Sequence, residues 1–221
     1  DKSFLPFLHD AIDRLWQKFS YRIIIFPGFE VQGPIGKGAH LVCLFEPGAP
    51  LSDVDAKLTG LGLPPHRRFG SNGEPLPVPT EDMTFAKMLG LIQGDKHLRG
   101  ICFGAHPNNS GILDGDTVEQ WWSQDVIQNE DFLCIELSKP RGDWLAATKT
   151  TLIKSILKNE DPRYARSHPI AAICNSDCKV LSQAENKSNY IGFRHTWIKM
   201  SEPSVEGLRQ TFLDHESRIR F

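Results

Sequence analysis

The feature that most constrains this chain is the alternation of short apolar runs with segments of helical periodicity. Several runs are apolar at every position, which is typical of strands buried on both faces of a sheet. Strands that alternate with helices favour a largely parallel sheet or barrel. We therefore predict one α/β domain over residues 1–221, since α/β barrels of this length commonly form a single domain.

The same patterns predict where each element lies. Apolar runs predict strands over residues 22–26, 29–31, 40–45, 99–105, 132–137, 169–174 and 196–200. Helical spacing covers residues 4–19, 51–63, 83–92, 118–122, 144–157 and 204–213, the last with Ser204 as its N-cap. The segment 64–80 contains five prolines and no periodicity, so we predict an irregular loop over one rim of the sheet.

Charge and cysteine usage limit the partners and the compartment. The chain carries 25 basic and 27 acidic residues, so no bulk field favours nucleic acid or a membrane, and a polyanion would have to be held locally. No apolar run approaches the ~20 residues that span a bilayer, and we see no signal peptide. The cysteines are odd in number and lie mostly in strand-like runs, which predicts reduced, buried thiols in a cytoplasmic protein: Cys43, Cys102, Cys134, Cys174 and Cys178.

His106 is the first candidate for chemistry. The apolar run 101–103 is followed by Gly104-Ala105-His106-Pro107. Because Pro107 cannot extend a strand, the strand should end here, and the His106 imidazole should lie at its carboxyl end. In α/β proteins, ligands bind beyond the carboxyl ends of the strands. The alternative is a purely structural hydrogen bond.

A predicted hairpin supplies the second and third candidates. Glu30 and His40 are each five residues from Ile35, at the middle of a Gly-rich turn. If the strands pair symmetrically about Ile35, the two side chains are cross-strand neighbours, which suits a shared metal ion. The alternatives are a Glu–His hydrogen bond at the hairpin base, or a register shifted by a bulge.

Asp177 is the fourth candidate. It follows the apolar run 170–174 in Asn175-Ser176-Asp177, where a carboxylate is either a ligand or general base, or the N-cap of a helix. Carboxylates and imidazoles without an obligatory thiolate suit Zn, Mn or Fe. Clustered ions of this kind support phosphoester hydrolysis.

Short motifs that contain these candidates follow one another in a definite order: Gly28-Phe29-Glu30-Val31, His40-Leu41-Val42, Gly104-Ala105-His106-Pro107 and Ser176-Asp177. This order resembles that of PHP domains, the polymerase and histidinol phosphatase superfamily. The C-terminal motifs are similar to those of PHP modules fused to an AAA- or SMC-like ATPase, the TrlF type: Thr196-Trp197-Ile198-Lys199-Met200, Pro203-Ser204 and Gly207-Leu208-Arg209.

The resemblance implies a distorted (βα)7 barrel that binds up to three metal ions, with Glu30, His40, His106 and Asp177 as ligands. It also implies an ATPase domain on the same polypeptide, so we expect this chain to be part of a longer protein. Two departures matter. The family opens with a His-x-His strand, which residues 1–20 cannot supply, and its usual Asp-x-His motif here carries Lys179 at the His position. Either the first strands lie outside this chain or the site has decayed.

We therefore expect a cytoplasmic, metal-dependent phosphoesterase module with no membrane partner. A metal-bridging hydroxide would attack phosphorus in line, and a basic side chain such as Lys179 or Arg141 would hold the phosphate. Nucleic acid is a substrate class that fits, because ATPases of this type often work on DNA or RNA. The alternative is a catalytically inactive barrel that binds a partner or regulates the ATPase.

Overall fold

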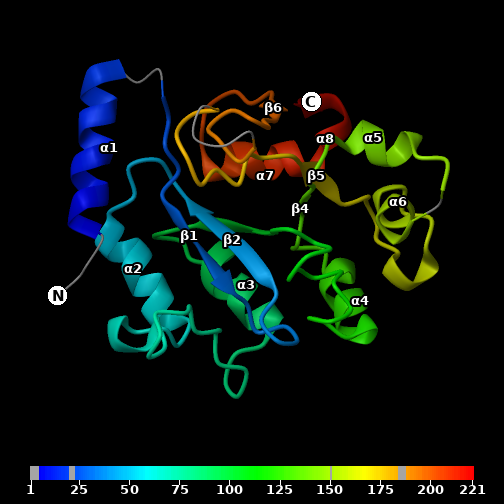
Figure 1. Cartoon of the computed structure of the whole chain (residues 1–221), viewed down its shortest axis with the longest axis horizontal. Helices are drawn as coiled ribbons and strands as arrows, with labels where there is room; N and C mark the ends of the chain where they lie inside the picture. Colours follow the sequence, from blue (N-terminus) through cyan, green and yellow to red (C-terminus); the bar gives the residue numbers. More distant parts are fainter. Residues whose placement is uncertain (1–4, 20–22, 150, 184–187) are drawn as a thin grey trace.

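The computed structural model describes residues 5–19, 23–149, 151–183 and 188–221, and its centre is a five-stranded sheet in the order β1-β2-β3-β4-β5. The strands are β1 (Gly28–Gln32), β2 (His40–Phe45), β3 (Gly100–Gly104), β4 (Cys134–Glu136) and β5 (Ala171–Ile173). The helices are α1 (Leu5–Phe19), α2 (Leu51–Gly60), α3 (Phe85–Gln93), α4 (Gln120–Gln128), α5 (Arg141–Ala146), α6 (Leu152–Leu157), α7 (Val205–Leu213) and α8 (His215–Arg218) (Figure 1).

The expected (βα)7 barrel is wrong, because the sheet is open and mixed. β1, β2 and β3 pair antiparallel, and only β3, β4 and β5 are parallel. A barrel needs its first and last strands to pair, whereas here β1 and β5 form the two edges. The predicted strand 22–26 is also wrong over residues 23–26, which form no strand; Arg22 lies outside the described residues.

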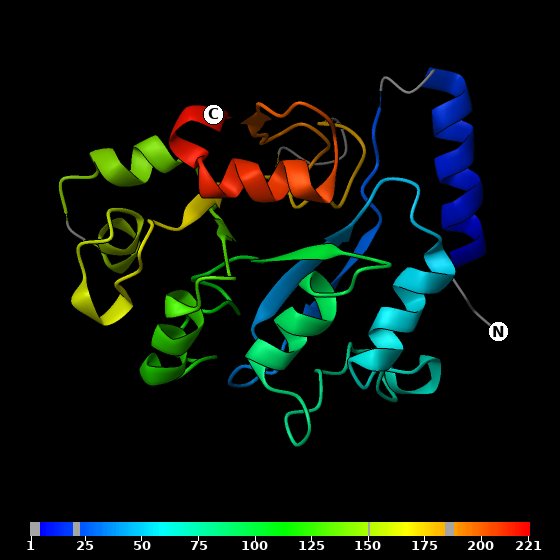
Figure 2. The same ribbon diagram turned by 180° about the vertical axis from the view of Figure 1, so that it is seen from behind.

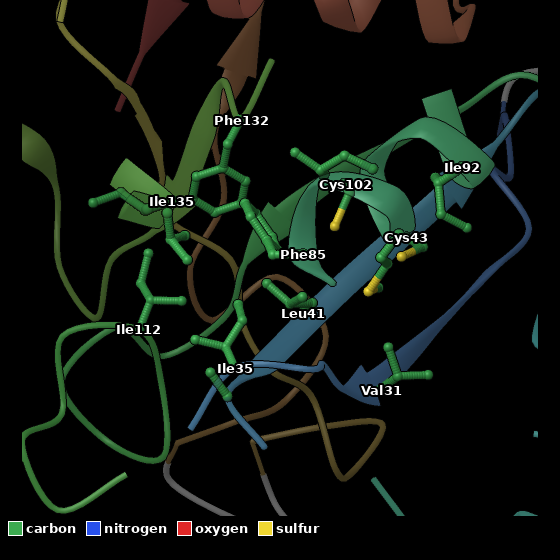
Figure 3. Packing of buried hydrophobic residues seen from close by; sticks show 14 of the residues in the cluster. Val31, Ile35, Leu41, Cys43, Phe85, Ile92, Cys102, Ile112, Phe132 and Ile135 are labelled. Carbon is green, nitrogen blue, oxygen red and sulfur yellow. The ribbon is translucent and has the colours of Figure 1, made fainter. Parts of the chain in front are cut away.

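Both faces of the sheet are covered at its centre, which explains why β3 and β5 are buried and apolar throughout. α3 and α4 lie on one face, and α7 lies across the other, as the two opposite views show (Figure 1, Figure 2). β3 illustrates the alternation: Cys102 faces α3, while Ile101 and Phe103 face α7. The larger core lies on the α3 side, where the rings of Phe85 and Phe132 meet edge to face at 5.4 Å between centroids (Figure 3).

The thiols follow the sequence prediction. Cys43, Cys102, Cys134 and Cys174 are buried and reduced, and Cys178 is exposed. Burial raises the pKa of the Cys43 and Cys134 thiols well above the ordinary value, so both remain protonated.

The helix predicted over 144–157 is divided into α5 and α6. Thr151 caps α6 by accepting a hydrogen bond from the Lys154 amide, and the Lys154 ammonium donates to the Ala147 carbonyl at 2.5 Å. The break is therefore stabilised by its own polar groups. The segment 64–80 is irregular apart from a 3-10 turn at Pro65–Arg67, and Val78 N–H donates to Gln32 O, which ties this loop to the hairpin.

The strand predicted over residues 196–200 is present, but it does not belong to the central sheet. β6 (Trp197–Ile198) pairs antiparallel with β7 (Ile219–Arg220) in a separate two-stranded sheet. Between them, Ser204 caps α7 by accepting from Gly207 N–H at 3.0 Å, as predicted. The residues before β6 are therefore free to run beside the loop that follows β5, and this placement shapes the candidate site.

Candidate functional site at the carboxyl edge of the sheet

Hydrogen bonds between loops bring the start of β2 and the end of β3 to one edge of the sheet. Ala105 N–H donates to His40 O at 3.0 Å, and His40 N–H donates to Ser110 O at 3.0 Å. Because β4 and β5 run parallel to β3, their carboxyl ends meet at this same edge. Polar residues of four strands can therefore share one site there.

Glu30 and His40 lie together, but not in the predicted register. Gln32 is opposite His40 and Glu30 is opposite Val42, so Glu30 and His40 are diagonal neighbours on one face. The turn is centred on Gly36, whose φ of 58° is left-handed, and not on Ile35. The shift of two residues keeps both side chains on the same face. His40 Nδ1 lies 2.6 Å from Glu30 Oε1, which is the hydrogen bond considered as the alternative to a shared ion.

His106 and Asp177 form a second pair. Their Nε2 and Oδ2 atoms are 3.8 Å apart, and both side chains are about 30% exposed. Both residues have left-handed backbones, with φ of 42° and 43°. Neither is glycine, so each conformation costs free energy, and such strain concentrates at functional sites. No helix begins at Asp177 in the described chain, so the N-cap alternative is wrong.

The two pairs are adjacent without merging into one cluster. The His40 and His106 rings contact edge to face, with centroids 6.3 Å apart. Within the described ranges, no three His, Cys, Asp or Glu side chains are arranged to hold a metal ion. His106 and Asp177 line a cavity of about 170 Å³, whereas Glu30 and His40 do not contribute to its walls.

Glu136, at the end of β4, is a site residue that sequence reasoning missed. It is only 8% exposed, and burial raises its pKa to about 7, with a further increase from the charges of Asp177 and Glu30. Arg194 acts in the opposite direction. The sequence signal that could have identified it is a single carboxylate near the end of the apolar run 132–137. Other candidates also lie near the ends of predicted strands.

Arg194 also lies at this edge, although it precedes the predicted strand 196–200 and the sequence pattern did not select it. Its backbone N–H donates to Ser176 Oγ, and the Ser176 hydroxyl donates to Arg194 O at 2.7 Å. The guanidinium donates to Asn175 O and Ser138 O, and it lines the same cavity as His106, Glu136 and Asp177. The Arg194 cation, which follows β5 in the chain, therefore faces the carboxylates of Glu136 and Asp177.

Trp144 adds a further polar group to this cavity. Its indole Nε1 is buried and has no hydrogen-bond partner among the residues that the structure describes, while Lys139 Nζ lies 4.5 Å from the ring centroid. A buried N–H without an acceptor is unfavourable.

The two predicted phosphate-binding residues lie at different places in the structure. Lys179 is exposed but stays at the site, with Nζ 3.6 Å from Asp177 Oδ2. Arg141 does not: it lines a different cavity with His215 and donates to Leu157 O. Its expected role at the phosphate is therefore not supported by its position, since the guanidinium is held by the Leu157 carbonyl away from the candidate site.

Comparisons of the chain with protein families, with curated proteins and with solved structures found no match in any of the three. Across the described residues, none of the helices has the length and apolar character needed to cross a bilayer. The functional argument therefore depends on the geometry of the site.

Proposed function

We propose that this chain is a metal-dependent phosphoesterase module of the PHP type. The observation that carries the proposal is the collection of three carboxylates and two imidazoles at one sheet edge: Glu30, His40, His106, Glu136 and Asp177. Burial is the main cause of the raised pKa of Glu136, and the negative charges of Asp177 and Glu30 add to it against the charge of Arg194, so the edge disfavours a further negative charge. A divalent cation would balance it.

The donor set fits such an ion. Carboxylate oxygen and imidazole nitrogen are ligands for Mn, Zn or Fe, and each pair, Glu30 with His40 and His106 with Asp177, offers one of each. When bound, the ion would supply an activated water and offset charge on a phosphate. Among the described residues, no three His, Cys, Asp or Glu side chains are arranged around one point. Water and substrate would therefore have to complete the coordination of the ion.

The chain's own residues would bind and orient the phosphate. Arg194 lines the cavity of about 170 Å³ and would donate to phosphate oxygens. Glu136, whose pKa burial raises to about 7, carries a proton in part of the molecules near neutral pH and would donate it to a leaving oxygen. Lys179, exposed beside Asp177, would contact the outer part of the substrate.

A specific observation favours the second candidate, a non-catalytic binding or regulatory module. Asp177 already has a cation beside it, with Lys179 Nζ at 3.6 Å, and the His106 imidazole lies at 3.8 Å. A carboxylate offset in this way needs no ion. An ATPase domain on the same polypeptide and a nucleic acid substrate remain expectations of the resemblance under either function.

Hydrolysis of bis-p-nitrophenyl phosphate in the presence of Mn²⁺ tests the proposal, with bound metal measured in parallel. His106→Ala should reduce turnover to background and weaken Mn²⁺ binding. His97→Ala is the matched control, because exposed His97 precedes β3 at the opposite end of the strand from His106. Wild-type protein that neither binds Mn²⁺ nor hydrolyses the ester would contradict the phosphoesterase and favour the non-catalytic module.

A further inference from the structure

The cavity of about 170 Å³ at the candidate site is lined by residues of two kinds. Four of them belong to the candidate site itself: His106, Glu136, Asp177 and Arg194. Four others have mainly apolar side chains and form what we call the apolar wall: Pro107, Leu137, Trp144 and Ile153. A molecule in this cavity would therefore contact the groups proposed to act on a phosphoester and a hydrocarbon surface at the same time.

The apolar wall is anchored in the larger core of the protein. Leu137 and Ile153 are buried members of that core, and Trp144 packs against it. The Leu137 backbone N–H donates to Ile173 O at 2.7 Å, which fixes this residue beside β5. α5 and α6 carry Trp144 and Ile153, and the two helices lie together at the β4–β5 side of the sheet (Figure 1, Figure 2). The shape of the wall is therefore set before a ligand binds.

The organic part of a substrate, and not its phosphate, fits the apolar wall. Hydrocarbon cannot hydrogen-bond phosphate oxygens, and burying charged oxygens against it is unfavourable. The Glu30–His40 pair, which would help to hold the ion, does not contribute to the cavity walls. An ion at the sheet edge would therefore draw the phosphate toward that edge, beside Arg194, and leave the apolar wall to the alcohol.

The volume of the cavity limits the size of that alcohol. An apolar cavity of about 150 Å³ binds benzene, so the cavity of about 170 Å³ has room for one six-membered ring. The half-buried indole of Trp144 offers an aromatic surface against which such a ring can pack. A fused pair of rings needs more space, which Leu137 and Ile153 would have to yield by disturbing the packed core.

We propose that the substrate is a phosphoester whose leaving alcohol is apolar and contains a single ring. The proposal rests on the phosphoesterase function, because it describes the part of the substrate that hydrolysis releases. It makes Ile153 a residue that determines specificity: its side chain limits the size of the alcohol, although it lies among none of the groups that would hold the ion.

Hydrolysis of phenyl phosphate and 1-naphthyl phosphate by the full chain with Mn²⁺ tests the size limit, because the two leaving groups have similar acidity and differ by one fused ring. The wild-type kcat/KM should be at least about tenfold higher for phenyl phosphate. Ile153→Ala removes part of the apolar wall and should lower this ratio about tenfold. Ile156→Ala is the matched control: both isoleucines are 2% exposed and lie in α6, but Ile156 does not line the cavity, so the ratio should stay unchanged.

Calorimetry with phenylphosphonate and 1-naphthylphosphonate, which cannot be hydrolysed, measures the same preference without turnover. Wild type should bind phenylphosphonate at least about tenfold more tightly, and Ile153→Ala should remove most of this difference. Protein that hydrolyses bis-p-nitrophenyl phosphate but does not prefer the single ring would keep the phosphoesterase and overturn this inference. A preference that Ile153→Ala leaves in place, or that Ile156→Ala lowers equally, would also overturn it. Protein that hydrolyses no ester would overturn the phosphoesterase and the inference together.

Discussion

The buried carboxyl group of Glu136 should make the stability of the protein depend on pH, and one substitution should remove that dependence. Its pKa rises from an ordinary 4.5 to about 7 in the folded protein, mainly because β4 buries it and then because Asp177 and Glu30 are nearby. The folded state therefore binds this proton more tightly than the unfolded state. Between pH 4.5 and 7 the folded protein loses stability as pH rises, since a buried carboxylate must ionise.

The size of the effect follows from the change in proton affinity. At about 1.4 kcal/mol for each factor of ten, the stated pKa values correspond to about 3 kcal/mol of stability that is present below pH 4.5 and lost above pH 7. Glu136→Gln keeps the shape and cannot ionise. The variant should match wild type near pH 4.5 and exceed it by about 3 kcal/mol above pH 7, as an upper value.

Urea denaturation of both proteins at several pH values between 4.5 and 8 measures this difference directly. Glu202→Gln is the control, because Glu202 is exposed and its substitution should leave the pH dependence unchanged. If Mn²⁺ binds at this edge, a concentration of a hundred times its dissociation constant should add about 2.7 kcal/mol to wild type at high pH. A difference between Glu136→Gln and wild type that does not vary with pH would refute the electrostatic account of Glu136.

Three further outcomes test the fold. Gly36→Ala should destabilise the protein by more than about 2 kcal/mol, because the added Cβ meets Thr117 O at a left-handed φ of 58°; Gly73→Ala, also left-handed but in open space, should cost about 1 kcal/mol in urea denaturation. Ser204→Ala should cost about 1 kcal/mol by the same measurement, since it removes the N-cap bond to Gly207 N–H. Titration with Ellman's reagent should modify Cys178 alone in native protein, and rapid modification of a second thiol would contradict the burial of the others.

Local patterns were sufficient to place most elements and some of the site. Apolar runs located β2, β3, β4 and β5 to within a few residues, because a strand covered on both faces excludes polar side chains. Pro107 ended the run at β3 and so placed His106 beyond the carboxyl end of that strand. The turn between β1 and β2 made Glu30 and His40 neighbours even though the predicted register was two residues off, because such a shift keeps both residues on one face.

Contacts between distant segments decided the rest. Whether the strands close into a barrel depends on pairing between the edges. The antiparallel pairing of β2 with β3 in an open sheet could not be read from the sequence, because the apolar runs look alike in either case. Glu136 became part of the site because β4 pairs with β3 and β5, and its charge state depends on carboxylates from other strands.

Arg194 and Arg141 show most clearly what the local sequence determines and what the tertiary structure decides. Sequence reasoning selected Arg141 for the phosphate and did not select Arg194, whereas the structure places Arg194 at the candidate site and Arg141 at a different cavity. Arg194 reaches the site because its backbone exchanges hydrogen bonds with Ser176, while Arg141 is held beside His215 by the Leu157 carbonyl. The sequence by itself determined which side chains follow strand ends, because strand ends are set by neighbouring residues. Only the tertiary structure decided which cations face them, because that depends on hydrogen bonds between residues far apart in the chain.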